Sequence, residues 1–346
     1  KKTTAKKTTT RATAKKAAPK KRATAKKATA KKTTTRATAK KAAPKKRTTA
    51  KKATAKKTTT RSTAKKATPK KRTTAKKATT KKKIIIGFSQ CCQDPWRTVM
   101  NKEMLREMDF YPQAELIIKE AGSESVKQLA QIRELLNLNV DAIIIAPNES
   151  EPLTEIVEEI HERGIPVILI DRETESEQYT AYIGADNYEI GKTACHYMAS
   201  QVNEQGKIVE LQMAMSISPA QDRSNGFRDA LKNYPNMKIV ATIGELEIGQ
   251  EITNIDRDFP AILAEHPDIT VVYGHTDALA ERAYRIARDK SKANQLFFLG
   301  VDGLAGKNGG IQMVEDGILN ASLVYPTGGT ESIRAAMAIV NNLPFE

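Results

Sequence analysis

Runs of apolar residues long enough for a buried β-strand recur along the chain from residue 83 onward. Between most of them, apolar residues step by three or four, as in SESVKQLAQIRELLN, where Val126, Leu129, Ile132 and Leu136 share one face. Continuous apolar strands alternating with amphipathic helices are typical of α/β proteins whose parallel sheets are covered on both faces. The expected strands are 83–89, 114–121, 141–147, 166–171, 207–213, 238–244, 269–274, 296–302 and 321–326. About 260 residues is long for one such unit, so the pattern predicts two lobes.

The composition changes at residue 83. Residues 1–83 use only Lys, Arg, Thr, Ala, Pro and Ser, and they contain 35 of the 57 basic side chains but no Asp or Glu. The other 263 residues therefore hold 22 basic and 40 acidic side chains. The net charge of +17 thus combines a tail of +35 with an acidic body of −18. The two parts have to be interpreted separately.

The basic tail repeats with a period of 25 residues, beginning KKTTAKKTTTRATAKKAAPKKRATA. It has no side chain that could form a core and it repels itself, so we expect residues 1–83 to be disordered. Its composition resembles the tails of linker histones and bacterial histone-like proteins, which implies salt-dependent, sequence-independent nucleic-acid binding. The other interpretation is an artificial junction or a mis-assembled reading frame that joins the tail to an unrelated domain.

Neither an enzyme site nor a metal site is indicated by the reactive residues. The four histidines lack metal-ligand spacing, and no Ser or Cys lies in a nucleophile-elbow context. Of the three cysteines, the adjacent pair Cys91 and Cys92 could form only a strained bridge, so reduced thiols near a strand end are the simpler interpretation. We therefore expect a non-enzymatic protein without a cofactor or a bound metal.

Polar and aromatic residues gather where the expected strands end, and ligands of parallel α/β sheets bind beyond those carboxyl ends. Five strand ends carry such groups: SQCCQDPWR with Asp94, Trp96 and Arg97, ILIDRE with Asp171 and Arg172, GHTD, GVDG with Asp302, and VYPTGG with Tyr325. Any one Asp could instead cap the next helix. Together, carboxylates that accept hydroxyl protons, planar guanidinium donors and aromatic faces favour a neutral polyhydroxylated ligand, that is, a sugar.

These same segments carry a family resemblance. Residues 84–346 resemble the type I periplasmic sugar-binding proteins of the ribose-binding group, which share a LacI-like core, through DPW, IPVILIDR, YIGADNYEIGK, DRSNGF, VDG and DGILNASLVYP. SQCCQDPWR together with YIGADNYEIG is more similar still to the extracytoplasmic sensor domains of Bacteroides-type hybrid two-component kinases, including fructose-sensing ones. The resemblance implies two Rossmann-like lobes joined by three crossovers, with a monosaccharide bound in the cleft and lobe closure as the signal or delivery step.

The resemblance also implies the contact residues and the identity of the ligand class. The ligand contacts it implies are Asp94, Trp96, Arg97, Asp171, Arg172, Arg223, Thr276, Asp302 and Tyr325. Thr276 stands where the family usually has Asn, and Leu246 and Glu247 replace an aromatic residue, so a pentose and a ketohexose such as fructose both remain open. Arg172 is expected to contribute most to binding and little to the stability of the unliganded protein.

The same resemblance implies the boundaries and the partners. Lobe one is expected at 84–185 plus 327–346 and lobe two at 186–326, with helices starting at Asp186 and Thr327. The chain is expected to stop before the final strand and crossover of such domains. A periplasmic location for 84–346, a membrane-anchored kinase or transporter as partner, and a homodimer are further implications. The alternative function is a DNA-associated protein with a sugar-binding effector domain, its tail in the cytoplasm or nucleoid. Because residues 1–83 lack an apolar core, a helix-turn-helix repressor is disfavoured.

Overall fold

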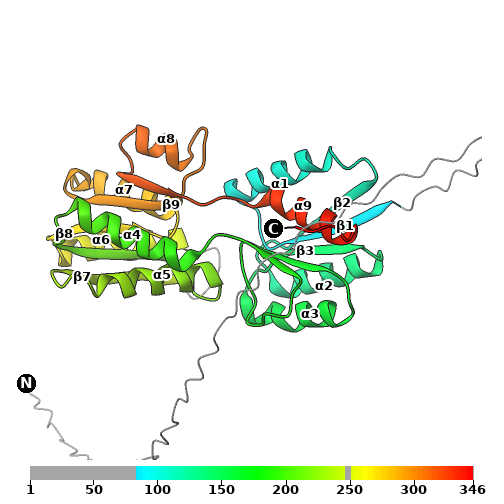
Figure 1. Cartoon of the computed structure of the whole chain (residues 1–346). Helices are drawn as coiled ribbons and strands as arrows, with labels where there is room; N and C mark the ends of the chain where they lie inside the picture. The colour runs from blue at the N-terminus through cyan, green and yellow to red at the C-terminus, as the bar shows by residue number, and fades with distance from the viewer. Residues whose placement is uncertain (1–82, 246–250, 346) are drawn as a thin grey trace, which may run out of the picture. The chain divides into compact units, whose positions relative to one another are not determined.

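The computed structural model describes residues 83–245 and 251–345, all of which belong to one unit of the chain. The expectation for the basic tail, apart from Lys83, and the replacements at Leu246 and Glu247 lie outside the described residues. Two parallel five-stranded sheets with helices on both faces make up the described part (Figure 1), so the predicted fold class is confirmed. None of the helices in the described ranges is long and apolar enough to cross a membrane.

The first sheet has the strand order β2-β1-β3-β4-β5. Its strands are β1 (Ile84–Gln90), β2 (Ala114–Glu120), β3 (Ala142–Ala146), β4 (Val167–Ile170) and β5 (Ala181–Ile183). Its helices are α1 (Pro95–Met108), α2 (Ser125–Asn137), α3 (Ser150–Glu162) and α9 (Gly329–Val340). Helices α1 and α9 pack together on one face, and α2 and α3 cover the other (Figure 1). We call this part lobe one.

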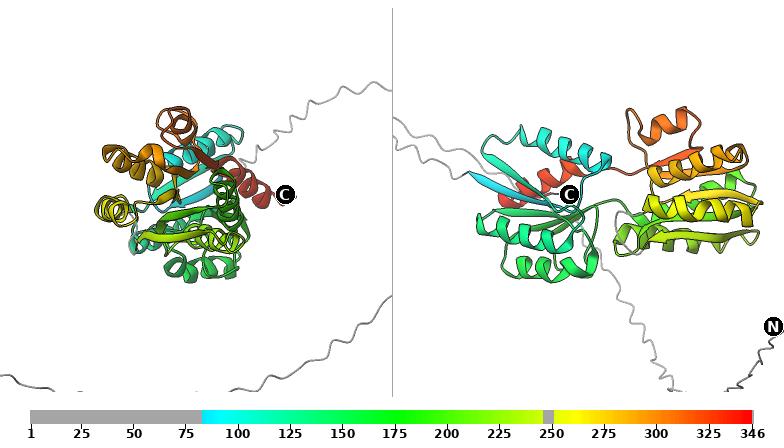
Figure 2. Two further views of the ribbon diagram at one scale, coloured as in Figure 1. Left: turned by 90° about the vertical axis from the view of Figure 1, so that its left-hand side faces the viewer. Right: turned by 180° about the vertical axis from the view of Figure 1, so that it is seen from behind.

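The second sheet has the strand order β10-β9-β8-β6-β7. Its strands are β6 (Gly206–Ala214), β7 (Met237–Glu245), β8 (Ile269–Gly274), β9 (Phe297–Asp302) and β10 (Ala321–Val324). Its helices are α4 (Asn187–Gln201), α5 (Ser218–Leu231), α6 (Glu251–Glu265), α7 (Asp277–Asp289) and α8 (Gly310–Glu315), with a short 3-10 turn η1 (Ala293–Gln295). The pair α4 and α5 lies on one face and the pair α6 and α7 on the other (Figure 2). We call this part lobe two.

All nine expected strands are present with ends that agree within one or two residues, and the continuous apolar pattern explains why. In β3, for example, all five residues of AIIIA are buried, because β1 and β4 flank the strand and helices cover both faces. Strand β5 was missed. It has only three residues, all partly exposed, so it lacks the apolar run that marked the other strands.

Two segments of the described chain connect the lobes, 184–186 between β5 and α4 and 325–328 between β10 and α9 (Figure 1). Asp186 caps α4 by accepting the backbone N–H of Glu189, as expected for a helix that starts there. The expected start of the last helix at Thr327 is wrong by two residues. Gly328 has a φ of +68°, a left-handed conformation that ends the connecting segment, and α9 begins only at Gly329.

Candidate ligand-binding site

A cavity of about 390 Å³ is lined by both lobes at the carboxyl ends of their strands. The structure brings all nine sequence-predicted contact residues to this one cavity: Asp94, Trp96, Arg97, Asp171, Arg172, Arg223, Thr276, Asp302 and Tyr325. For the residues at or just after strand ends, the reason is topological. Parallel strands end on the same edge of a sheet, so side chains that are far apart in sequence meet there.

Arg97 is the centre of a charged cluster in lobe one. Its Nη1 donates to Asp94 Oδ2 at 2.6 Å and its Nη2 donates to Asp171 Oδ2 at 2.5 Å. Asp94 also caps α1 by accepting the backbone N–H of Arg97 at 2.7 Å, so the helix-capping role considered above is real for this residue. Arg97 and Asp171 are both buried, and the cluster holds their side chains in fixed positions beside the cavity.

The cysteine pair adjoins this cluster as free thiols at the end of β1. Cys91 is buried, its Sγ accepts the Nε–H of Arg97 at 3.1 Å, and it lies 3.4 Å from Cys92 Sγ. Burial alone raises the pKa of the Cys91 thiol, but the hydrogen bond with Cys92 and the positive charges of Arg172 and Arg97 outweigh it and lower the pKa to about 5. Cys91 therefore serves as a third acceptor that orients the Arg97 guanidinium.

The Asp171–Arg172 pair sits in a tight turn at the end of β4. Asp171 has a φ of +68°, and the backbone N–H of Arg172 donates to the carbonyl of Ile170 at 2.7 Å, closing a three-residue turn. Such turns are rare and strained, and strained residues cluster at binding sites. Arg172 is 7% exposed, and its guanidinium donates Nη1 to the carbonyl of Asn148 at 2.7 Å. Arg172 thus faces the cavity and also ties β4 to the loop after β3.

Tyr325 lies in the second connecting segment and contacts both lobes. Toward lobe one, its hydroxyl donates to Asp171 Oδ1 at 3.0 Å and its ring stacks on Trp96, with centroids 5.4 Å apart. Toward lobe two, Arg223 lies over its ring, with the guanidinium carbon 4.6 Å from the centroid. Arg223 is 2% exposed and is itself held by Asn187 Oδ1 and the His275 carbonyl. Tyr325 therefore links cavity residues of both lobes to the segment that connects the lobes.

Asp302 differs from the other cavity carboxylates in having no hydrogen-bond partner for its side chain among the residues that the structure describes. It ends β9 with a φ of +131°, which for a non-glycine residue is strained. Burial raises the pKa of Asp302 well above its usual range, and the positive charge of Arg223 offsets this only in part. A carboxylate in this state gains most from a ligand that donates hydrogen bonds to it.

Asp277 lines the cavity but is not among the predicted contacts, although its motif GHTD follows one of the expected strands. Its carboxylate accepts the Ser322 hydroxyl at 2.6 Å and the backbone N–H of Gly303 at 2.9 Å. Burial raises the pKa of Asp277 to about 6, against the lowering effect of these two bonds. Asp277 therefore joins α7 to the loop after β9 and to β10, and it shapes the cavity wall through its neighbours.

The raised pKa of Asp277 predicts a pH-dependent contribution to stability. Because the folded-state pKa of about 6 exceeds the unfolded value of 3.8, the folded protein binds more protons as the pH falls through 6, and stability rises. Relative to Asp277→Asn, the wild type should gain about 2 kcal/mol in unfolding free energy between pH 7 and pH 4. Urea unfolding of both proteins at the two pH values measures the gain. An unfolding free-energy difference that stays constant with pH would contradict the assignment.

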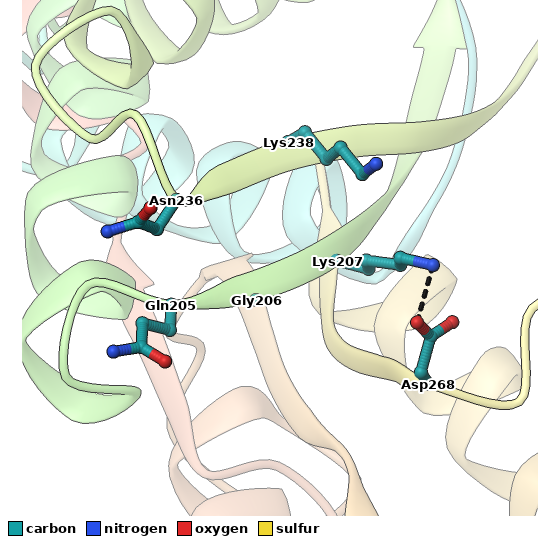
Figure 3. Close-up of a pocket in the computed structure, with 6 residues that line it drawn as sticks. All are labelled: Gln205, Gly206, Lys207, Asn236, Lys238 and Asp268. Atoms are coloured by element: carbon teal, nitrogen blue, oxygen red, sulfur yellow. Dashed lines mark ion pairs between the residues drawn. The ribbon is translucent and has the colours of Figure 1, made fainter.

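A second hollow lies at the opposite edge of the lobe-two sheet, where β6 and β7 begin. Figure 3 shows its lining residues, Gln205, Gly206, Lys207, Asn236, Lys238 and Asp268. Lys207 forms an ion pair with Asp268, whereas the Gln205 and Asn236 side chains point away from that pair. Ligands of parallel sheets bind at the carboxyl ends of the strands, so this hollow at the amino ends is not the candidate site.

Fold and cavity together define a two-lobed binding protein. Residues 86–343 match the family model described as a periplasmic binding protein domain, and the chain belongs to this family. A solved structure of the fructose-binding periplasmic domain of a hybrid two-component system is 38% identical, with a TM-score of 0.73, and the match covers 76% of this chain and 87% of that one. The resemblance to periplasmic sugar-binding proteins and to hybrid sensor domains is thereby confirmed.

Two curated relatives, at lower sequence identity, are also sugar-binding proteins. The ribose import binding protein of Bacillus subtilis (strain 168) is 26% identical over 188 residues, which are 54% of this chain and 59% of that protein's length. The galactofuranose-binding protein of Escherichia coli (strain K12) is 28% identical over 251 residues, 69% of this chain and 76% of the relative. These relatives are binding proteins and not enzymes, in line with the sequence prediction.

Proposed function

We propose that the chain binds a neutral monosaccharide, a ketohexose or a pentose, in the cavity at the strand ends, outside the cytoplasm. The observation that carries this proposal is the meeting of three arginines, three carboxylates that the sequence had singled out, and two aromatic rings around one cavity. Planar donors, oriented acceptors and ring faces are the groups that a polyhydroxylated ring with C–H faces requires.

The charges around the cavity support a neutral ligand. Arg97, Arg172 and Arg223 stand against Asp94, Asp171, Asp277 and Asp302, so the cavity has no excess of positive charge. The lobe-one arginines are moreover paired with Asp171 and Asp94. An anionic sugar would have to break these pairs or approach the unpartnered Asp302. We therefore expect sugar phosphates and uronic acids to be rejected.

The test is a calorimetric titration of the full chain with D-fructose, D-ribose, D-galactose, D-fructose 6-phosphate and D-galacturonate. The similarity to a fructose-binding domain makes D-fructose the first probe. Trp96 is the only tryptophan in the chain and lines the cavity, so its fluorescence reports binding at this site independently. Binding of a neutral sugar with a change in Trp96 fluorescence is the expected result. Tighter binding of the charged sugars than of every neutral one would refute the proposal.

Lobe closure is the proposed output of binding. A sugar that touches both lobes gains its full set of contacts only when the lobes approach, so binding shifts the population toward the closed form. We expect small-angle scattering to show a smaller radius of gyration at saturating ligand, with the basic tail contributing equally to both measurements. An unchanged radius at saturation would argue for a rigid site. Lobe closure would be transmitted to a membrane-anchored kinase or transporter part. A homodimer is a further proposal, for the oligomeric state.

The alternative function, nucleic-acid binding, rests on the charge of residues 1–83. All but Lys83 of that segment lies outside the described residues, and this function stays a prediction from sequence alone.

A further inference from the structure

Lobe two presents a largely apolar wall to the cavity. Its members are spread over four separate parts of the lobe: the end of β6, the start of α6, the loop after β9, and α8. They are Met213, Ile252, Leu304 and Met313, and Ile217 at the N-cap of α5 lies beside them. Met213 and Leu304 are partly exposed, and Ile252 is 40% exposed, so these side chains are accessible from the cavity. We call these five residues the apolar wall.

The polar groups of lobe two do little to interrupt this wall, because most of them are already engaged. The Asp277 carboxylate is occupied by Ser322 and Gly303, and the Thr276 hydroxyl oxygen caps α7 by accepting the backbone N–H of Leu279. The Arg223 guanidinium is held by Asn187 and His275. Among the described lining residues of lobe two, the side chains of Asp302 and Asn308 make no hydrogen bond, and Arg223 Nη2 and the Thr276 hydroxyl proton are the remaining donors.

Lobe one has the opposite character. The side chains that it contributes to the cavity include the ring of Trp96 and four polar groups, Asp94, Arg97, Asp171 and Arg172, which are ordered by mutual hydrogen bonds and ion pairs. A ligand in the cavity is therefore offered hydrogen bonds on one side and an apolar surface on the other. A hydroxyl turned toward the apolar wall would lose its water without gaining a partner.

Resting on the proposed function, we propose that the site takes sugars with an apolar edge, namely deoxy sugars or alkyl glycosides whose unhydroxylated carbon faces the apolar wall. The hydroxyls of such a ligand face lobe one and Asp302. Replacing the wall-facing hydroxyl by hydrogen or a methyl ether removes a desolvation cost and adds buried apolar surface. The expected gain in affinity over the parent sugar is about tenfold.

The test compares D-fructose with 1-deoxy-D-fructose, 6-deoxy-D-fructose and methyl β-D-fructofuranoside by calorimetric titration of the full chain. At least one derivative should bind about tenfold tighter than D-fructose. If D-fructose binds and none of the derivatives binds more tightly, the apolar-edge proposal is overturned and the proposed function stands. If neither these compounds nor the sugars of the panel above bind at all, both proposals fall together.

A pair of matched variants assigns the preference to the apolar wall. Met213→Gln places a hydrogen-bonding amide of similar shape in the wall, whereas Met215→Gln makes the same change two residues away at an exposed position that does not line the cavity. Met213→Gln should reduce the affinity ratio of derivative to parent at least threefold, and Met215→Gln should leave it unchanged. A ratio is insensitive to partial unfolding of either variant. Equal derivative-to-parent affinity ratios in Met213→Gln and wild type would show that the apolar wall does not determine the preference for an apolar edge.

Discussion

Replacing Asp302 with Asn should weaken sugar binding on the order of a hundredfold. The Asp302 carboxylate faces the cavity without a hydrogen-bond partner among the described residues, so its acceptor capacity is available to ligand hydroxyls. Hydrogen bonds to a charged group contribute roughly 1.5–3 kcal/mol each. In Asn, one carboxylate oxygen becomes an uncharged amide oxygen and the other is replaced by an NH2 group, which donates instead of accepting. The combined loss amounts to about 3 kcal/mol, or two orders of magnitude in affinity.

The same variant should not destabilise the unliganded protein. Burial raises the pKa of Asp302, which means that the folded protein holds its ionised form at a cost in free energy. Asn removes that cost and leaves the backbone requirement at this position unchanged, because it has the same shape as Asp. We therefore expect a melting temperature at pH 7 equal to or above that of the wild type. Asp289→Asn, at an exposed position on α7, is the control and should change neither quantity. A large loss of stability together with normal affinity would assign Asp302 a structural role.

The sequence located the site because strand ends can be read from apolar periodicity. Asp94, Asp171, Asp302 and Tyr325 each follow a run of apolar residues, and parallel pairing then dictates that such ends meet. The position of Arg223 could not be reached in this way. It lies in the middle of α5, on a face that packs toward the connecting segment, and only the resemblance through DRSNGF pointed to it.

Two features of the site were beyond the sequence. Three members of the apolar wall are indistinguishable from ordinary core residues in the sequence, and only their three-dimensional position shows that they line a cavity: Met213, Leu304 and Met313. The pairing of Arg97 with Asp171 joins the first turn of α1 to the end of β4, 74 positions apart, and depends on rotamers that periodicity does not encode. Polar side chains at strand ends therefore identified where a ligand binds, while their mutual pairing and the apolar wall required the packed structure.

Arg172→Ala should lower sugar affinity by about a hundredfold as well, for a different reason. Arg172 lines the cavity, with Nε 3.7 Å from Asp171 Oδ2 and Nη1 bound to the Asn148 carbonyl, so the rest of its planar donor group is available to vicinal hydroxyls. Two charged hydrogen bonds, partly replaced by water in the variant, contribute about 3 kcal/mol. Arg172→Lys keeps the charge but cannot donate in a planar fork, so its affinity should lie between those of wild type and Ala.

The structure changes the expectation that Arg172 matters little for stability. Its Nη1 satisfies a buried backbone carbonyl at 2.7 Å, and truncation leaves that carbonyl without its charged partner. We expect the unliganded Arg172→Ala protein to lose about 2 kcal/mol of unfolding free energy, whereas Asp171 keeps its bond from Arg97. Arg133→Ala removes an exposed arginine of lobe one that pairs with Glu159 at the surface, and it should alter affinity and stability only slightly. Calorimetric titration measures the effect of each variant on affinity, and urea unfolding measures its effect on stability. If Arg172→Ala keeps normal affinity for every sugar that binds the wild type, the role of Arg172 is only structural, connecting β4 to the loop after β3.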